Sequence, residues 1–168
     1  MKIIGLIGFS GSGKTHFLTE AIKKLKNYGL DTSVIKNIHE HQIDKEGKDT
    51  YKYIQSGAQL SVTKNLYNET TIFLKKELSI EGLINWIKKA PFKTDIIFFE
   101  GFRDLEIPTI LCIKDENNIK SQLNTNVRAL SGKIIINKEE KELMGYKLIN
   151  IDKNFEEFVK LFNINELR

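Results

Sequence analysis

The sequence predicts an α/β protein with a mostly parallel central sheet, and three observations lead to this. Apolar, strand-like runs alternate with segments of helical periodicity along the 168 residues. The run 96–99 is apolar at every position, which is typical of a strand buried on both faces of a parallel sheet. A glycine-rich segment at 8–15 stands between the first apolar run and the first helical segment, where a strand-to-helix loop is expected.

The expected strands follow from short apolar runs that polar residues or glycines bound. A polar turn, Tyr67-Asn68-Glu69, separates two of these runs and predicts an inserted β-hairpin. The expected strands cover residues 2–7, 32–36, 96–99, 109–113 and 133–136, with the hairpin at 59–64 and 70–75.

The expected helices follow from apolar residues that recur at spacings of three and four. These helices cover residues 14–28, 49–56, 79–90 and 154–162. Gly29 and Gly57 end the first two, and Pro91 closes the third because proline cannot continue a helix. The last helix carries four apolar residues on one face, a spacing that indicates core packing rather than a ligand site. They are Phe155, Phe158, Val159 and Phe162.

Residues 8–15 read Gly-Phe-Ser-Gly-Ser-Gly-Lys-Thr, which is the Walker A spacing G-x-x-x-x-G-K-[ST]. Between a strand and a helix, this motif predicts a three-layer P-loop NTPase fold rather than a chance glycine-rich turn. We expect the backbone N–H groups of Ser10, Gly11, Ser12 and Gly13 to bind the phosphates of a nucleoside triphosphate, helped by the helix dipole.

The residues at the start of the first helix complete the predicted phosphate site. We expect Lys14 to reach the β- and γ-phosphates and to neutralise charge that develops on the γ-phosphoryl group. The Thr15 hydroxyl is the expected ligand of Mg²⁺. His16 follows on the first helical turn, where it either donates to a phosphate or is exposed.

A P-loop needs a partner acid that manages Mg²⁺ and the attacking water. Asp95 and Glu100 bracket the central strand, and the carboxyl ends of parallel strands lie beside the loop. We therefore expect Glu100 to serve as the catalytic and metal-binding acid, and Asp95 to be structural. Gly101 lets the chain bend, and Arg103 then either contacts a phosphate or is solvated.

The polar loop 37–48 contains two of the chain's three histidines, His39 and His41. A switch-like loop that senses the γ-phosphate, with Asp44 or Asp49 near Mg²⁺ through water, is our first interpretation. A transition-metal site at the two histidines and an ordinary solvated loop are the alternatives.

Residues 137–140 read Asn-Lys-Glu-Glu and follow an apolar run. In that place regulatory GTPases carry Asn-Lys-x-Asp, whose acid accepts hydrogen bonds from guanine N1 and N2. Here the fourth residue is Glu140, one methylene longer, which weakens the match, so a guanine-reading loop and a chance match both stay open.

Length and composition limit the number of domains and argue against nucleic-acid-binding and membrane proteins. The 168 residues predict a single nucleotide-binding domain over 1–168. The net charge is +4, and no block of five like charges occurs, so we expect no nucleic-acid surface. No apolar stretch reaches the roughly 20 residues that cross a bilayer, so we expect no membrane partner. The single cysteine, Cys112, lies in an apolar run, which favours a buried core residue and a cytoplasmic protein.

Four segments in order resemble the molybdopterin-guanine dinucleotide biosynthesis accessory protein B family, MobB. They are the phosphate loop 8–15, the histidine loop 36–44, Gly47-Lys48-Asp49 before a helix that ends Ser56-Gly57-Ala58, and Glu100-Gly101-Phe102-Arg103 followed by Pro108. The resemblance covers about the first two thirds of the chain. The family usually has histidine or threonine where Asn37 stands, and often lysine where Arg103 stands.

The resemblance implies a GTP-binding accessory protein with slow GTPase activity and Mg²⁺ as its metal. It implies a role beside the guanylyltransferase that attaches GMP to molybdopterin, with molybdopterin itself as a possible ligand. It also implies a homodimer, for which the hairpin at 59–75 is the candidate interface.

Two other functions remain open at this point. A P-loop small-molecule kinase would use the polar stretch 115–130, which contains Arg128, as its lid. A metal-delivery GTPase would use His39 and His41.

Overall fold

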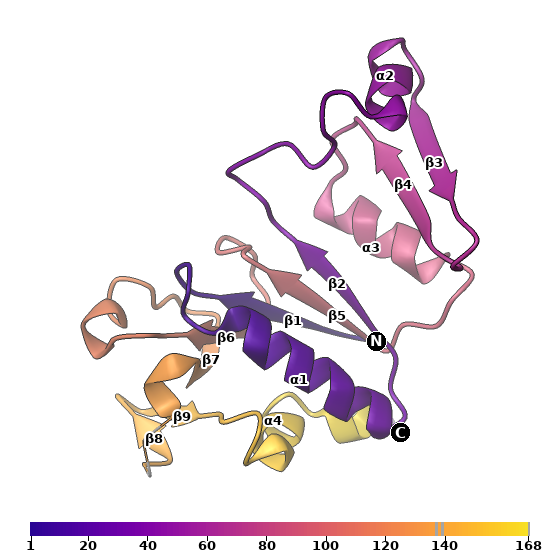
Figure 1. The fold of residues 1–168 in the computed structure, drawn as a ribbon. Helices are drawn as coiled ribbons and strands as arrows, with labels where there is room; N and C mark the ends of the chain where they lie inside the picture. Colours follow the sequence, from indigo (N-terminus) through magenta and orange to yellow (C-terminus); the bar gives the residue numbers. More distant parts are fainter. Residues whose placement is uncertain (137, 139, 168) are drawn as a thin grey trace. The chain divides into compact units, whose positions relative to one another are not determined.

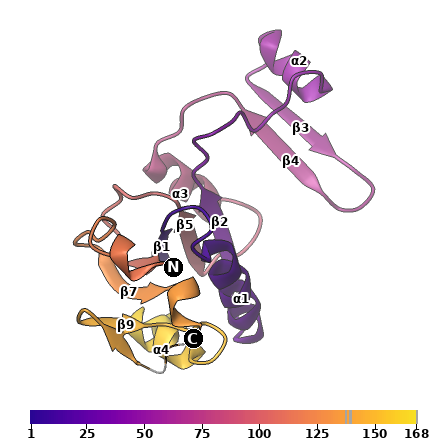
Figure 2. The ribbon, with the colours of Figure 1, turned by 60° about the vertical axis from the view of Figure 1, so that its left-hand side comes forward.

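The computed structural model describes residues 1–136, 138 and 140–167. Contacts divide the chain into two units, one made of Met1–Asn37 with Pro91–Arg168 and the other of Ile38–Ala90. Figures 1 and 2 show the ribbon, and each unit is described by itself below. The expectation of one domain over 1–168 stays a prediction.

The first unit is built on a mostly parallel sheet, as predicted. In the described residues the sheet has seven strands in the order β2-β5-β1-β6-β7-β9-β8, and the pair β8–β9 alone is antiparallel. The strands are β1 (Lys2–Ile7), β2 (Thr32–Lys36), β5 (Ile96–Glu100), β6 (Thr109–Cys112), β7 (Val127–Ser131), β8 (Glu142–Leu143) and β9 (Tyr146–Leu148).

Helices α1 (Lys14–Asn27) and α4 (Phe155–Leu161) pack against one face of this sheet (Figure 1). Phe158 of α4 is fully buried, and its ring lies 5.8 Å from that of Phe17 and 6.5 Å from that of Phe98. The predicted core face of the last helix is therefore confirmed. On the other face, Ile7 and Leu111 pack with residues of the short 3₁₀ segments that follow β6 and β7.

Glu100 and the phosphate loop lie at the same edge of the sheet because β1 and β5 are parallel. Leu6 of β1 is in register with Glu100 of β5, and the N–H of Gly101 donates to the carbonyl oxygen of Leu6 (2.9 Å). This edge holds the carboxyl ends of the strands, where ligands bind in open α/β sheets.

The predicted strand at 133–136 is wrong. Lys133–Ile135 form a 3₁₀ turn (η2). The strand that lies beside β6 on the side away from β1 is β7, just before this turn. Gly132, with φ +93°, ends β7 and turns the chain, so the apolar run after it caps the sheet instead of extending it. The polar stretch 115–130, considered as a lid, holds the 3₁₀ turn Glu116–Asn118 (η1) and most of β7.

The second unit contains α2 (Asp49–Gln55), the hairpin β3 (Leu60–Lys64) and β4 (Thr70–Leu74), and α3 (Ile80–Lys88). The hairpin is antiparallel with Leu60 opposite Leu74, as the sequence predicts. The side-chain oxygen of Asn65 accepts from two backbone N–H groups of the turn, which fixes the turn locally. Ser79 caps α3 by accepting from the N–H of Gly82 (3.0 Å).

Among the described helices, none has the length and apolar character that a bilayer span would need.

Candidate functional site

The loop between β1 and α1 has a shape that only glycine permits at its first position. Gly8, Gly11 and Gly13 all have positive φ. A Cβ on Gly8 would lie 2.2 Å from the carbonyl oxygen of Cys112, on the neighbouring strand β6. Because that oxygen belongs to the sheet backbone, it cannot move aside, so the loop curls only with glycine here.

This loop presents hydrogen-bond donors that the protein itself does not use. In the described part of the chain, the N–H groups of Ser10, Gly11 and Gly13 have no acceptor, whereas the N–H of Ser12 donates to the carbonyl oxygen of Phe9 (3.3 Å). The Ser12 hydroxyl is buried and has no partner there either. Unused donors at the start of a helix form a site for an anion.

Lys14 places a positive charge over the same loop. Its ammonium group donates to the carbonyl oxygens of Gly8 (2.8 Å) and Phe9 (2.9 Å), so it folds back over the loop from the first turn of α1. Thr15, the next residue, is exposed. The exposed His16 ring pairs through Nε2 with the carboxylate of Asp152 (2.9 Å).

Glu100 brings a buried carboxylate to the end of β5, beside the strand that carries the loop. Its side chain is 9% exposed, and Oε1 lies 3.6 Å from Nζ of Lys36, which ends β2. Burial raises the pKa of the nearby Cys112 thiol to about 12, while the Lys14 charge lowers and the Glu100 charge raises that pKa. The charges of Lys14 and Glu100 therefore both lie close enough to Cys112 to affect its thiol.

Asp95 lies at the opposite edge of the sheet, where the sequence predicts a structural residue. Burial would raise the pKa of its carboxyl group, but two contacts outweigh burial and leave the pKa below its ordinary value. Its Oδ2 accepts from the N–H of Asp31 (2.9 Å), and its Oδ1 pairs with Lys93 (3.0 Å). The carboxylate therefore joins β2 to β5 at their amino ends.

Arg103 is anchored beside the phosphate loop. The centre of its guanidinium lies 5.3 Å from the centroid of the Phe9 ring, at cation–π distance, and Nη2 donates to Oε1 of the buried Gln122 (2.9 Å). The sequence left open whether Arg103 contacts a phosphate or is simply solvated, and these contacts show that its guanidinium is not simply solvated. The two contacts hold a positive charge next to the loop.

Asp49 and the histidine loop belong to the unit 38–90. Asp49 begins α2, is exposed and pairs with Lys52 (3.4 Å), while Oδ1 of Asp44 accepts from the hydroxyl of Thr50 (3.1 Å). His39 and His41 are both exposed. Within the described residues, no group of three or more His, Cys, Asp or Glu side chains is arranged to hold a metal ion.

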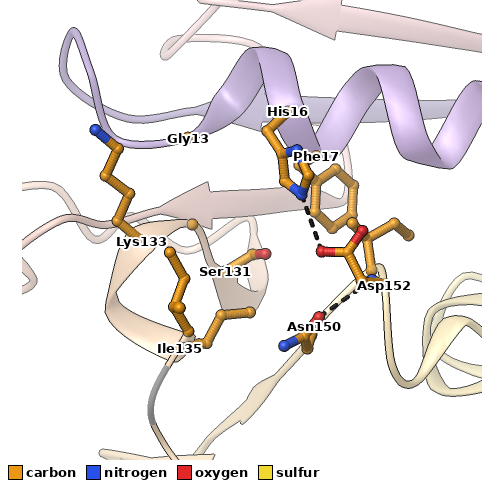
Figure 3. Close-up of a pocket in the computed structure, with 11 residues that line it drawn as sticks. Gly13, His16, Phe17, Ser131, Lys133, Ile135, Asn150 and Asp152 are labelled. Atoms are coloured by element: carbon orange, nitrogen blue, oxygen red, sulfur yellow. Dashed lines mark hydrogen bonds and ion pairs between the residues drawn. The ribbon is translucent and has the colours of Figure 1, made fainter.

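Sequence reasoning missed a pocket of about 320 Å³ that adjoins the phosphate loop (Figure 3). The start of α1, the turn after β7 and the segment after β9 form its walls. The turn after β7 also touches the loop, because the N–H of Lys133 donates to the carbonyl oxygen of Ser12 (3.0 Å). The lining residues are Gly13, His16, Phe17, Ser131, Gly132, Lys133, Ile135, Ile136, Asn150, Ile151 and Asp152.

One feature of the sequence could have pointed to this pocket. Asn150-Ile151-Asp152 follows an apolar run, as ligand-binding polar residues do at the carboxyl end of a strand. In the proposed guanine-reading segment, Asn137 and Glu139 lie outside the described residues. Lys138, from the same segment, pairs with Glu116 (2.5 Å).

The chain is similar to proteins of one family. The family model described as "Molybdopterin guanine dinucleotide synthesis protein B" (MobB) matches residues 3–133. A Methanocaldococcus jannaschii protein named as a putative molybdopterin-guanine dinucleotide biosynthesis adapter protein is 31% identical over 122 residues, which cover 70% of this chain and 49% of that protein. The Haemophilus influenzae molybdopterin-guanine dinucleotide biosynthesis adapter protein is 33% identical over 122 residues, which cover 69% of this chain and 65% of that protein.

The matched segment thus spans about half of the archaeal relative and somewhat less than two thirds of the bacterial one. The crystal structure of Bacillus subtilis MobB matches the fold with a TM-score of 0.73 at 22% identity, covering 99% of this chain and 98% of that one. The family model covers most of the sheet and all of the phosphate loop. The chain therefore belongs to the MobB family.

Proposed function

We propose that this protein is a GTP-binding adaptor with weak GTPase activity that assists guanylyl transfer to molybdopterin. Two relatives carry the name of an adapter protein of molybdopterin-guanine dinucleotide biosynthesis, which supports the adaptor role. The partner in that role is the guanylyltransferase, with molybdopterin as a further ligand. An adaptor needs to hold its nucleotide rather than turn it over rapidly.

The phosphate loop is the observation that carries this proposal. The unused N–H groups of Ser10, Gly11 and Gly13 and the unpartnered Ser12 hydroxyl are the donors that phosphate oxygens require. Lys14 adds an ammonium group, which moves from the loop carbonyl oxygens to the β- and γ-phosphates when the nucleotide binds. His16 and the anchored Arg103 flank this cluster with further positive or donor groups.

Thr15 and Glu100 are the residues that would hold Mg²⁺. They fit this ion because Mg²⁺ takes oxygen ligands and is usually held by only one or two protein groups together with water and phosphate oxygens. When bound, Mg²⁺ would neutralise charge on the β- and γ-phosphates. A water-mediated contact of Asp44 or Asp49 with this ion stays a prediction from the sequence.

The side chains around the loop favour slow hydrolysis. An arginine that reaches the γ-phosphate accelerates hydrolysis by roughly 10³ to 10⁵. Arg103 is already held by Gln122 and the Phe9 ring. Lys14 and Glu100 therefore carry the catalysis that we propose, without an arginine that reaches the γ-phosphate. A turnover of about 10 per second, typical of enzymes, would contradict this account.

Thermal melting with GTP, GDP and ATP in the presence of Mg²⁺ tests the proposal. A nucleotide at 100 times its dissociation constant stabilises the fold by about 2.7 kcal/mol, which raises the melting temperature by roughly 5–10 °C. Lys14→Ala should abolish this shift. Lys23→Ala is the matched control because Lys23 lies on the same helix and, among the residues that the structure describes, pairs only with Glu20. Equal shifts in both variants would refute the phosphate site.

The hairpin supports a homodimer. Four apolar side chains on β3 and β4 are 40–54% exposed, namely Leu60, Val62, Ile72 and Leu74. We propose that a second copy of the chain covers them, because such a patch is costly in water. Val62→Lys should then shift the protein toward monomer in sedimentation equilibrium. Ile43→Lys, at an exposed position outside the hairpin, should not.

A further inference from the structure

The pocket beside the start of α1 adjoins the loop that we propose holds the phosphates of a nucleotide. Gly13 belongs to both the loop and the pocket wall. The pocket volume of about 320 Å³ is that of a small ligand site. It lies at the carboxyl edge of the sheet, between the segments that follow β7 and β9.

The walls of this pocket are apolar and suit a flat ring. Phe17, Ile135 and Ile151 are buried. Ile136 also lines the pocket, although it is 60% exposed. An exposed isoleucine at the rim gains stability when an aromatic base covers it. The apolar character of these walls therefore fits a nucleobase.

Asn150 and Asp152 form the polar edge of the pocket. The side-chain oxygen of Asn150 accepts from the N–H groups of Asp152 (3.1 Å) and Lys153 (3.3 Å). This turns the Asn150 amide nitrogen away from that turn, and Figure 3 shows it on the side of Ile135. In the described part of the chain, this nitrogen has no acceptor.

Asp152 presents an acceptor beside that donor. One carboxylate oxygen, Oδ2, is held by Nε2 of His16 (2.9 Å), and Lys24 donates to the Asp152 carbonyl oxygen (2.8 Å). The other oxygen, Oδ1, has no donor among the residues that the structure describes. A carboxylate has about four acceptor positions, so the His16 contact leaves room for two more donors.

Guanine carries the complementary pattern on one edge. Its O6 accepts, while N1–H and the 2-amino group beside it donate. Adenine places a donor at N6 and an acceptor at N1, so both of its groups would face groups of the same kind. We propose that this pocket binds the guanine base, with Asn150 donating to O6 and Asp152 accepting from N1–H and the 2-amino group.

This inference rests on the proposed GTP binding and adds the residues that select guanine. Both residues lie outside the segment 3–133 that the family model matches. The segment 137–140 stays a separate prediction from the sequence, because Asn137 and Glu139 lie outside the described residues.

Isothermal titration of the full chain with the Mg²⁺ complexes of GTP, ATP and xanthosine triphosphate tests it. Xanthine carries an oxygen where guanine has the 2-amino group. Asp152→Asn converts one acceptor into a donor, so it should weaken GTP binding about 10- to 100-fold and strengthen xanthosine triphosphate binding by a similar factor. Asp31→Asn is the matched control because Asp31 lies before β2, at the opposite edge of the sheet.

A second variant tests the role of Asn150 separately. Asn150→Asp retains the acceptor that holds the turn but removes the donor to O6, so it should weaken GTP binding while the melting temperature without nucleotide stays unchanged. Wild-type protein that binds ATP as tightly as GTP would overturn the inference. So would an Asp152→Asn variant with unaltered GTP and xanthosine triphosphate affinities, a result that leaves GTP binding itself intact. Wild-type protein that binds none of the three would overturn both proposals.

Discussion

Gly8→Ala should destabilise the protein well beyond the cost of its backbone conformation. At φ +145° an alanine is strained whatever the space around it, which costs about 1–2 kcal/mol. Its Cβ would also lie 2.2 Å from the carbonyl oxygen of Cys112 and 2.7 Å from the hydroxyl of Ser12. Relieving such overlap shifts the loop or β6, at about 1–3 kcal/mol. The two costs together amount to about 2–5 kcal/mol.

Urea denaturation measures this loss, and Gly29→Ala separates its two parts. Gly29 also has positive φ (+83°), but a Cβ there meets nothing within 4 Å. The control should therefore lose only about 1–2 kcal/mol. In thermal melting, the additional cost at Gly8 should appear as a further drop of about 2–12 °C. Equal losses in the two variants would refute the steric explanation of the loop.

Four further predictions follow from named contacts. Asp95→Ala should cost about 1–3 kcal/mol at neutral pH in urea denaturation. The difference from wild type should shrink as the pH falls below about 4, because the lowered pKa of Asp95 stabilises the fold only while its carboxylate is ionised. Cys112, with its pKa of about 12, should react with iodoacetamide at pH 8 only as fast as the protein unfolds, which mass spectrometry checks. Phe158→Ala should cost about 3–5 kcal/mol in urea denaturation. Glu100→Gln should raise the Mg²⁺ concentration needed for GTP binding in titrations, with little effect on binding measured without Mg²⁺.

Local patterns in the sequence predict most of the fold. Strands β1 and β2 have the expected boundaries, because an apolar run ends at a glycine in one case and at a polar loop in the other. The hairpin, α1 and α4 also follow from turn residues and from apolar spacing. These elements depend on short-range chemistry, which the sequence displays directly.

The elements around the pocket depend on pairing between distant segments, which local propensity does not reveal. Isoleucines at 134–136 suit a strand by propensity, yet Gly132 turns the chain first, and the strand is the more polar segment Val127–Ser131. Asn150 and Asp152 become candidate pocket residues only because β9 pairs with β7, which brings the segment after β9 beside the start of α1. The placement of Glu100 was predictable because parallel strands share one carboxyl edge.

The packing of α1 against α4 sets an order of events during synthesis. Phe17 and Leu18 leave the ribosome early, whereas Phe158 and Val159, which cover them, come from near the end of the described chain. Until then the apolar stripe of the first helix is open to water and to other nascent chains. The residues that complete this core flank Asn150 and Asp152. A growing chain therefore carries the phosphate-loop sequence long before the core beneath its first helix can be completed.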